Sequence, residues 1–226
     1  MRNGEQLLLT LVIPIGLLLG LTLTDVIVQV AGPVRIPRAL ATVLTVSVIS
    51  TAFTSLAIAT GFERRSGALR FLGTTPLSRG ELLGGKLLAT AAVTSISAAA
   101  VMVVALAIGW RPTPGSAWAI PVLLLGAAAF ASWGMALAGL LRAEAVLAVA
   151  NGVFLVLIMF GGVVIPAASL PGPLGALATL LPSGALADAL DAALVQGSVP
   201  APLPIVVLLV WLVGGATLAA RTFRWS

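Results

Sequence analysis

The chain has 226 residues, of which 60% are hydrophobic and only 8% are charged. Soluble domains carry about 25% charged residues, so this composition excludes an ordinary soluble protein. The apolar runs are long and continuous, which predicts helices rather than the alternating strands of a membrane barrel. We therefore predict an all-α integral membrane protein, in which residues 1–226 form a single transmembrane domain.

Two residue types that are absent restrict the chemistry. The chain has no cysteine and no histidine, which removes disulfides, thiol chemistry and the commonest metal ligand. We interpret its net charge of +5 as the cytoplasmic bias of a membrane protein rather than as a nucleic-acid surface. The prediction is a chain in a lipid bilayer that binds no metal, no cofactor and no nucleic acid.

Six runs are apolar and long enough to cross a bilayer, at about 20 residues per helix. The predicted spans are residues 7–24, 39–62, 81–109, 118–141, 145–165 and 203–220. The first run is longer than the apolar core of a signal peptide and no cleavage site follows it, so we interpret it as a span.

Residues 61–88 form the one long polar interruption and hold five of the twelve basic residues. A basic residue at the centre of a membrane helix costs roughly 2.5–3.5 kcal/mol, so this stretch is predicted to lie in water or among headgroups. We call residues 63–80 the elbow. Residues 63–72 are predicted to form one short amphipathic helix, and Pro76 to shape a turn after it. Ser78 and Glu81 form a capping box, which predicts the start of the third span.

Hydroxyl side chains recur on one face of the second span. Ser47, Thr51 and Thr54 are spaced three and four residues apart, which places them on one helical face. Asn151 is the polar residue predicted to be buried in the fifth span. Two interpretations stay open for these four residues: they form packing contacts between helices, or they line a route for a substrate.

The segment 166–202 is too apolar for an ordinary loop. We predict a partly re-entrant piece at residues 174–181, followed by a short helix at the outer interface, with Ser183 as its N-cap. Leu186, Leu190 and Leu194 form its apolar stripe, and Asp188 and Asp191 lie on another face.

The basic residues also predict an orientation. With the amino terminus inside, nine basic residues fall on the inner side and three, Arg35, Arg38 and Arg111, on the outer side. Because cytoplasmic loops carry the excess of lysine and arginine, both termini and the elbow are predicted to be cytoplasmic. The abundance of alanine and the preference for arginine over lysine favour the inner (plasma) membrane of a bacterium.

No catalytic set of residues is visible. Residues 80–87 resemble a nucleotide-binding P-loop, but Leu87 follows Lys86 where a serine or threonine must hold Mg²⁺. No carboxylate lies deep in a predicted span, which argues against a proton- or sodium-coupled transporter. We therefore expect that the chain is not an enzyme.

The elbow reads E-R-R-x-G-x-L-R-x-L-x-x-T-P-L-S-R-x-E-L-L-x-G-K. This pattern resembles the cytoplasmic segment between the second and third spans of type-2 ABC transporter permeases. Residues 160–197 resemble the same family's glycine–proline end of span five, which an L-P and a short external helix follow. The resemblance implies the membrane half of a bacterial exporter for drugs, antibiotics or lipid-like molecules, with a coupling helix between spans two and three.

The family also implies partners. Two such subunits pair, as a homodimer or a heterodimer, and each docks a separate ATPase subunit that binds ATP and Mg²⁺. Carried over residue by residue, the coupling role falls on Glu63, Arg64, Arg65, Gly67 and Arg70, with Pro76 and Ser78 shaping the turn into span three. A six-span protein that exports haem or another cofactor, or that handles lipids, is the alternative.

Overall fold

Residues 2–23, 34–72 and 78–222 are described by a computed structural model, and they contain helices and no strand. The α-helices are α1 (Arg2–Leu23), α2 (Arg35–Val48), α3 (Leu56–Arg65), α4 (Ala68–Leu72), α5 (Arg79–Ala107), α6 (Ala119–Leu140), α7 (Ala143–Phe160), α8 (Pro173–Leu180), α9 (Pro182–Leu194) and α10 (Pro202–Thr222). A π-helical segment, η1 (Ile49–Ser55), joins α2 to α3, and the 3₁₀ turns η2 (Pro114–Trp118) and η3 (Ala167–Ser169) precede α6 and α8.

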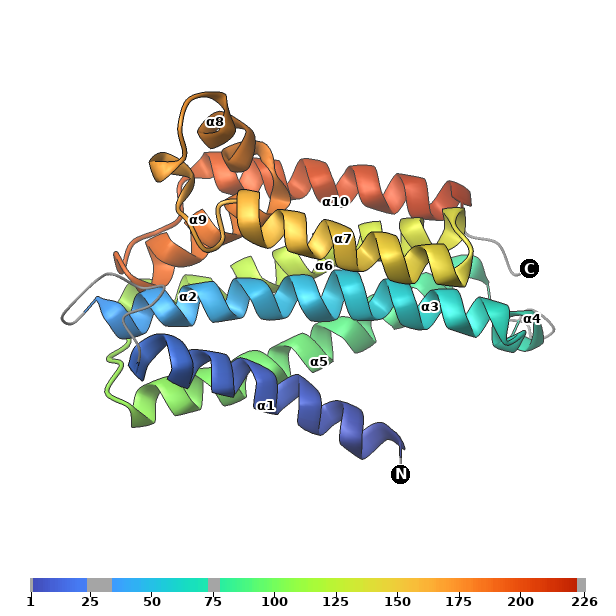
Figure 1. Cartoon of the computed structure of the whole chain (residues 1–226), viewed down its shortest axis with the longest axis horizontal. Helices are drawn as coiled ribbons and strands as arrows, with labels where there is room; N and C mark the ends of the chain where they lie inside the picture. The colour runs from blue at the N-terminus through green and yellow to red at the C-terminus, as the bar shows by residue number, and fades with distance from the viewer. Residues whose placement is uncertain (1, 24–33, 73–77, 223–226) are drawn as a thin grey trace.

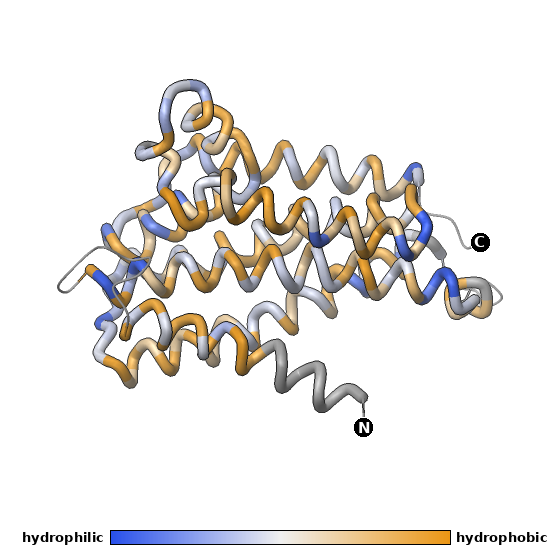
Figure 2. Tube along the Cα trace, in the orientation of Figure 1, coloured by the Kyte–Doolittle hydropathy of each residue, from blue (hydrophilic) through white to orange (hydrophobic). Residues whose placement is uncertain are grey.

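Among the described residues, five continuous helices are long and apolar enough to cross a membrane. They cover Arg35–Arg65, Gly80–Ala107, Pro114–Leu140, Ala143–Phe160 and Pro202–Thr222. The shorter apolar part of α1, Leu11–Leu23, packs beside α2 and α5. These helices form the all-α membrane fold that the composition predicts, and hydrophilic residues gather mostly at the two ends of the bundle (Figures 1 and 2).

We name the two ends of the bundle by what lies there. The elbow end holds the end of α3, α4, the α6–α7 turn and the end of α10, and the α9 end holds the start of α2, η2 and α9 (Figure 1). The chain reaches the α9 end through α7 and leaves it again through α10 (Figure 1). The helices α8 and α9 meet at an angle of 82°. Because the chain enters and leaves them at the same end of the bundle, they form a re-entrant pair rather than another span (Figure 1).

The second span is longer than predicted at both ends. It runs for 31 residues, Arg35–Arg65, against the predicted 39–62. At 1.5 Å per residue it is about 46 Å long, which exceeds the roughly 30 Å of bilayer hydrocarbon. Both of its charged ends therefore extend beyond the apolar layer.

Three local predictions were wrong. Residues 63–72 are not one helix: α3 ends at Arg65, Gly67 takes a φ of +80°, and α4 starts at Ala68. The fifth span ends at Phe160 rather than 165, because Gly161 follows as its C-cap and Gly162 turns the chain at a φ of +78°. Ser183 is not an N-cap, since its hydroxyl donates to the carbonyl oxygen of Gly161 at 3.0 Å.

The helix α6 is the centre of the packing. It contacts α2, η1, α3, α5, α7, α9 and α10. A β-carbon on its Gly134 would lie 2.8 Å from the carbonyl oxygen of Phe53, so the backbones of α6 and η1 meet directly there. The Trp133 indole donates to the carbonyl oxygen of Trp211 at 2.8 Å and fixes α10 on the same helix. Small residues permit such close approach between membrane helices.

The short helix α9 packs closely against the spans at its end of the bundle. Its predicted apolar stripe is confirmed, since Leu186, Leu190 and Leu194 are all buried. The stripe packs into α2, α6 and α10, and a β-carbon on Gly126 of α6 would lie 2.7 Å from Leu186. The re-entrant pair thus closes the α9 end of the bundle.

We expect Gly134→Ala to lower the stability of the folded chain by about 1–3 kcal/mol, because the new methyl group overlaps a backbone oxygen that cannot move aside. The matched control is Gly84→Ala on α5, where a β-carbon meets nothing within 4 Å. The apparent melting temperature in detergent, followed by size-exclusion chromatography after heating, measures both. An equal response of the two variants would contradict the packing described for α6.

Candidate functional site at the elbow end

The last three residues of α3 are charged and contact three different elements. Successive residues of an α-helix point about 100° apart, so Glu63, Arg64 and Arg65 cannot share a direction. Their partners lie on α5, on the α6–α7 turn and on α7. The end of α3 is therefore a junction that ties one helix to three others, and we call it the α3 junction.

Arg64 caps the end of α6. One guanidinium nitrogen, Nη1, donates to the carbonyl oxygen of Gly139 at 3.0 Å, and Nη2 donates to the carbonyl oxygen of Leu141. The last carbonyls of a helix have no partner within the helix, and basic side chains satisfy them while matching the negative end of the helix dipole. The sequence-based interpretation placed Arg64 on a docking surface, whereas its polar atoms face this chain's own backbone.

Glu63 pairs with Lys86 and joins α3 to α5. The lysine side chain is only 14% exposed, and the carboxylate is 41% exposed. The attraction within this partly buried ion pair is stronger than in a fully exposed pair, because the solvent screens it less. Lys86 was predicted to lie at the start of span three, but nothing in the local pattern identified its partner.

Arg65 pairs with Glu144 in the first turn of α7. Both side chains are largely exposed, at 60% and 63%, so the pair contributes little to stability. The outward position of Arg65 leaves it accessible to a partner. The two residues lie far apart in the sequence, so no local pattern could identify this pair.

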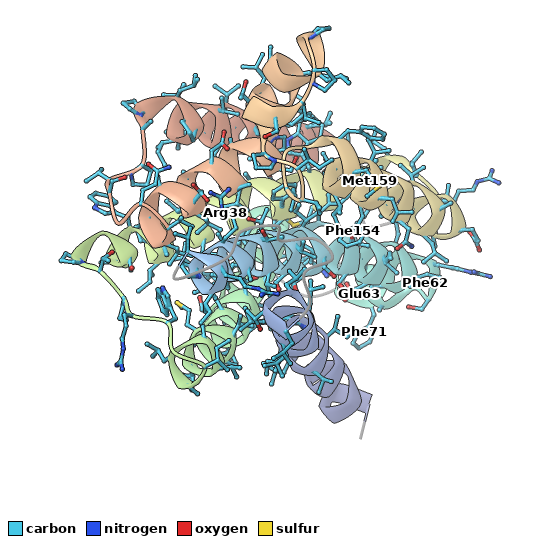
Figure 3. The ribbon with its side chains drawn as sticks, turned by 60° about the vertical axis from the view of Figure 1, so that its left-hand side comes forward. Arg38, Phe62, Glu63, Phe71, Phe154 and Met159 are labelled. Atoms are coloured by element: carbon cyan, nitrogen blue, oxygen red, sulfur yellow. The ribbon has the colours of Figure 1, made fainter. Side chains whose placement is uncertain are left out.

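Beyond the junction, Gly67 turns the chain into α4. Its φ of +80° suits glycine, because other residues pay about 1–2 kcal/mol in this region. Leu69 of α4 is buried, while Phe71 is 74% exposed and Phe62, near the end of α3, is 40% exposed. Figure 3 labels both rings together with Glu63 at the elbow end of the bundle. Two exposed aromatic rings beside a charged junction were missed, since the apolar pattern alone treats aromatic residues as core.

The turn into α5 starts as predicted. The Ser78 amide donates to Glu81 Oε2 at 2.7 Å, and the Glu81 amide donates to Ser78 Oγ at 3.2 Å, which confirms the capping box. The side chain of Arg70 and the whole of Pro76 lie outside the described part of the chain. Their predicted roles stay predictions.

The substrate route assigned to four residues stays a prediction, and the structure places these residues in different surroundings. Ser47 is buried and bonds its own helix at the Val43 carbonyl, and Thr54 is buried where η1 packs. Asn151, expected to be buried, is exposed on α7 and donates to the Leu147 carbonyl at 2.8 Å. Neither of the two described cavities is lined by any of these residues or by half-buried Thr51.

Charges at the α9 end form a second group. Arg38 Nε of α2 lies 3.1 Å from Asp191 Oδ1 of α9. Asp188 lies one turn earlier on α9, within the re-entrant pair. Burial raises the pKa of Asp188, and the neighbouring charge of Asp191 raises this pKa further.

The fold and the α3 junction define a polytopic helical membrane protein with a charged elbow between its second and third spans. Comparison with known families identifies the class: the model of the ABC-2 family transporter protein matches residues 34–221. The chain belongs to the ABC-2 family and is a permease component of an ABC transporter. No curated protein matches the sequence.

We expect Arg64→Ala to destabilise the α6–α7 turn by about 1.5–3 kcal/mol, because two carbonyl oxygens lose a charged donor. The matched control is Arg65→Ala, which removes an exposed ion pair and should cost less than about 1 kcal/mol. Hydrogen exchange of the amides of residues 139–146, together with the melting temperature in detergent, separates the two. Equal protection in both variants would show that Arg64 does not cap α6.

Proposed function

We propose that this chain is the membrane subunit of an ATP-driven exporter for a hydrophobic or amphiphilic molecule, and that a separate ATPase docks at the elbow end. The observation that carries the proposal is the α3 junction. A force applied to α4 or to the end of α3 reaches α5, α6 and α7 through side-chain contacts that need no intervening loop.

The proposed docking surface consists of side chains that are exposed at the elbow end of the bundle. Arg65 and Phe71 point outward, and Gly67 sets the angle between α3 and α4. Arginine and aromatic residues are enriched in the energetically dominant parts of protein interfaces. Glu63 and Arg64, which bond to this chain, take the role of transmitting motion rather than binding the partner. Arg70, Pro76 and Ser78 keep their family role in the elbow.

The orientation, the subunit pairing and the type of cargo are proposed from the distribution of basic residues, the family and the apolar character of the bundle. The basic residues favour an elbow in the bacterial cytoplasm, where ATP is available. Two permease subunits, identical or paralogous, pair around the transport route. The family match supports a transporter, and the apolar character of the bundle favours a cargo that partitions into lipid.

The orientation can be tested directly because the chain has no cysteine. A single cysteine at Ser66, exposed in the turn before α4, should react with a membrane-impermeant maleimide only after the cells are permeabilised. A single cysteine at Ser198, exposed after α9, should react in intact cells. Reaction of the first variant in intact cells would invert the proposed topology.

The docking surface is tested by co-expressing the tagged chain with the ATPase subunit that co-purifies with it and reconstituting the complex in proteoliposomes. We expect the double variant Arg65→Glu, Phe71→Ser to reduce both the ATPase retained by the permease and the vanadate-sensitive ATP hydrolysis by about tenfold, or about 1.4 kcal/mol. Arg111→Glu, which reverses an exposed charge next to η2 at the α9 end of the bundle, is the control and should change neither. Full ATPase retention by the double variant would refute docking at this surface.

A further inference from the structure

A cavity of about 790 Å³ lies at the α9 end of the bundle. Its walls come from the start of α2, the segment 162–172, α8 and α9. It lies at the opposite end of the bundle from the α3 junction, and no residue of the elbow lines it. Its volume falls within the range of about 300–1,000 Å³ that is usual for small-molecule sites.

Three charged side chains line this cavity: Arg38, Asp188 and Asp191. Figure 3 labels Arg38 beside the ribbon of α9. Among the residues that line the cavity, the formal charges are one positive and two negative, an excess of one negative charge; Arg35, one turn before Arg38 on α2, is not among the lining residues. The other elements that pack on α9, which are α6, η2 and the neighbouring part of α10, bring no charged residue to it.

The ion pair between Arg38 and Asp191 leaves hydrogen-bonding capacity unused among these three charged side chains. Arg38 Nε and Asp191 Oδ1 are 3.1 Å apart, yet both atoms are buried without a hydrogen bond among the described residues. Asp188 is half-buried, and no hydrogen bond or ion pair to another described residue engages its carboxylate. A half-buried carboxylate without a partner is costly, and a cation beside it would offset that cost.

Apolar atoms make up much of the remaining wall. Val163, Leu170 and Ala176 line it, together with Pro166 and glycines of the segment after α7. Apolar walls with a few converging polar groups are typical of ligand sites, and the polar groups determine which ligand is held. Here the polar groups favour positive charge, and the walls favour hydrophobic bulk.

We propose that this cavity is a binding site for a hydrophobic organic cation, with Asp188 facing the positive charge and the Arg38–Asp191 pair flanking it. The proposal of a binding site depends only on the cavity and on the charges that line it. Its role as the place where cargo leaves rests on the proposed export function, and would make lipophilic cations the substrate class.

Tetraphenylphosphonium and tetraphenylborate are suitable probes because they share size and shape and differ in the sign of their charge. Equilibrium dialysis of the purified full chain in uncharged maltoside micelles, corrected with protein-free micelles, measures both affinities. We expect the phosphonium to bind more tightly than the borate. Asp188→Asn should weaken phosphonium binding by about tenfold, whereas Arg38→Gln should strengthen it, since it leaves the cavity with a second uncompensated negative charge.

Opposite effects of these two variants distinguish a charge effect from a loss of structure, which would weaken binding in both. Glu81→Gln, which removes one negative charge while keeping a residue that serves in a capping box, and Arg111→Gln are the matched controls and should leave both affinities unchanged. Equal binding of the two probes, or changes in the same direction for Asp188→Asn and Arg38→Gln, would overturn the proposal. Because no ATPase is present, neither result depends on the docking surface.

The cation could come from a soluble molecule or from an amine-bearing lipid headgroup. Adding phosphatidylethanolamine to the micelles distinguishes the two sources. Competitive displacement of the phosphonium assigns the cavity to a headgroup amine, and unchanged binding assigns it to a soluble cation. Displacement that persists in the Asp188→Asn variant would contradict a role for this carboxylate.

Discussion

The α3 junction is the constraint on which the rest of the arrangement depends. Helix ends leave carbonyl oxygens without partners, and the end of α6 is one such place. Arg64 supplies the missing donors from a different helix, and Glu63 holds α3 to α5 at the same level through Lys86. Since neighbouring residues on a helix point in different directions, one turn of α3 connects most of the bundle to the elbow.

The helix that carries this junction also reaches the opposite end. α2, η1 and α3 form one continuous rod from Arg35 to Arg65, with α6 packed beside it. Its middle is π-helical, and this irregular turn coincides with the close approach of Gly134 to the carbonyl oxygen of Phe53. Segments of π-helix often occur where a helix serves a function. Here the wider turn lets the backbone of α6 approach while both charged ends of the rod keep their positions.

Local signals were predictable from the sequence, and long-range pairings were not. The Ser78–Glu81 capping box and the buried stripe of α9 depend on residues three or four positions apart, and both were predicted. The partners of Arg64 lie 75 and 77 residues away, and Ser183 bonds a carbonyl 22 residues earlier, so no local pattern contains them. The same limit explains Asn151: a periodic pattern assigns a polar residue to a span, but the arrangement of the neighbouring helices decides whether it is covered.

The two charged groups at the ends of this rod belong to one continuous helix, so a displacement of the rod along its axis would act on both. Arg38 and Arg64 lie on one continuous helix, one beside Asp191 and the other beneath the last carbonyls of α6. Hydrogen bonds weaken steeply beyond about 3.2–3.5 Å, so a shift of the rod by about 1 Å along its axis would break contacts at both ends together. The π-helical segment does not decouple them, because its backbone stays helical throughout. Under the proposed function, a push on the elbow would change the charge pairing in the distant cavity without unfolding any helix, and it would couple the two ends of the bundle through a single rod.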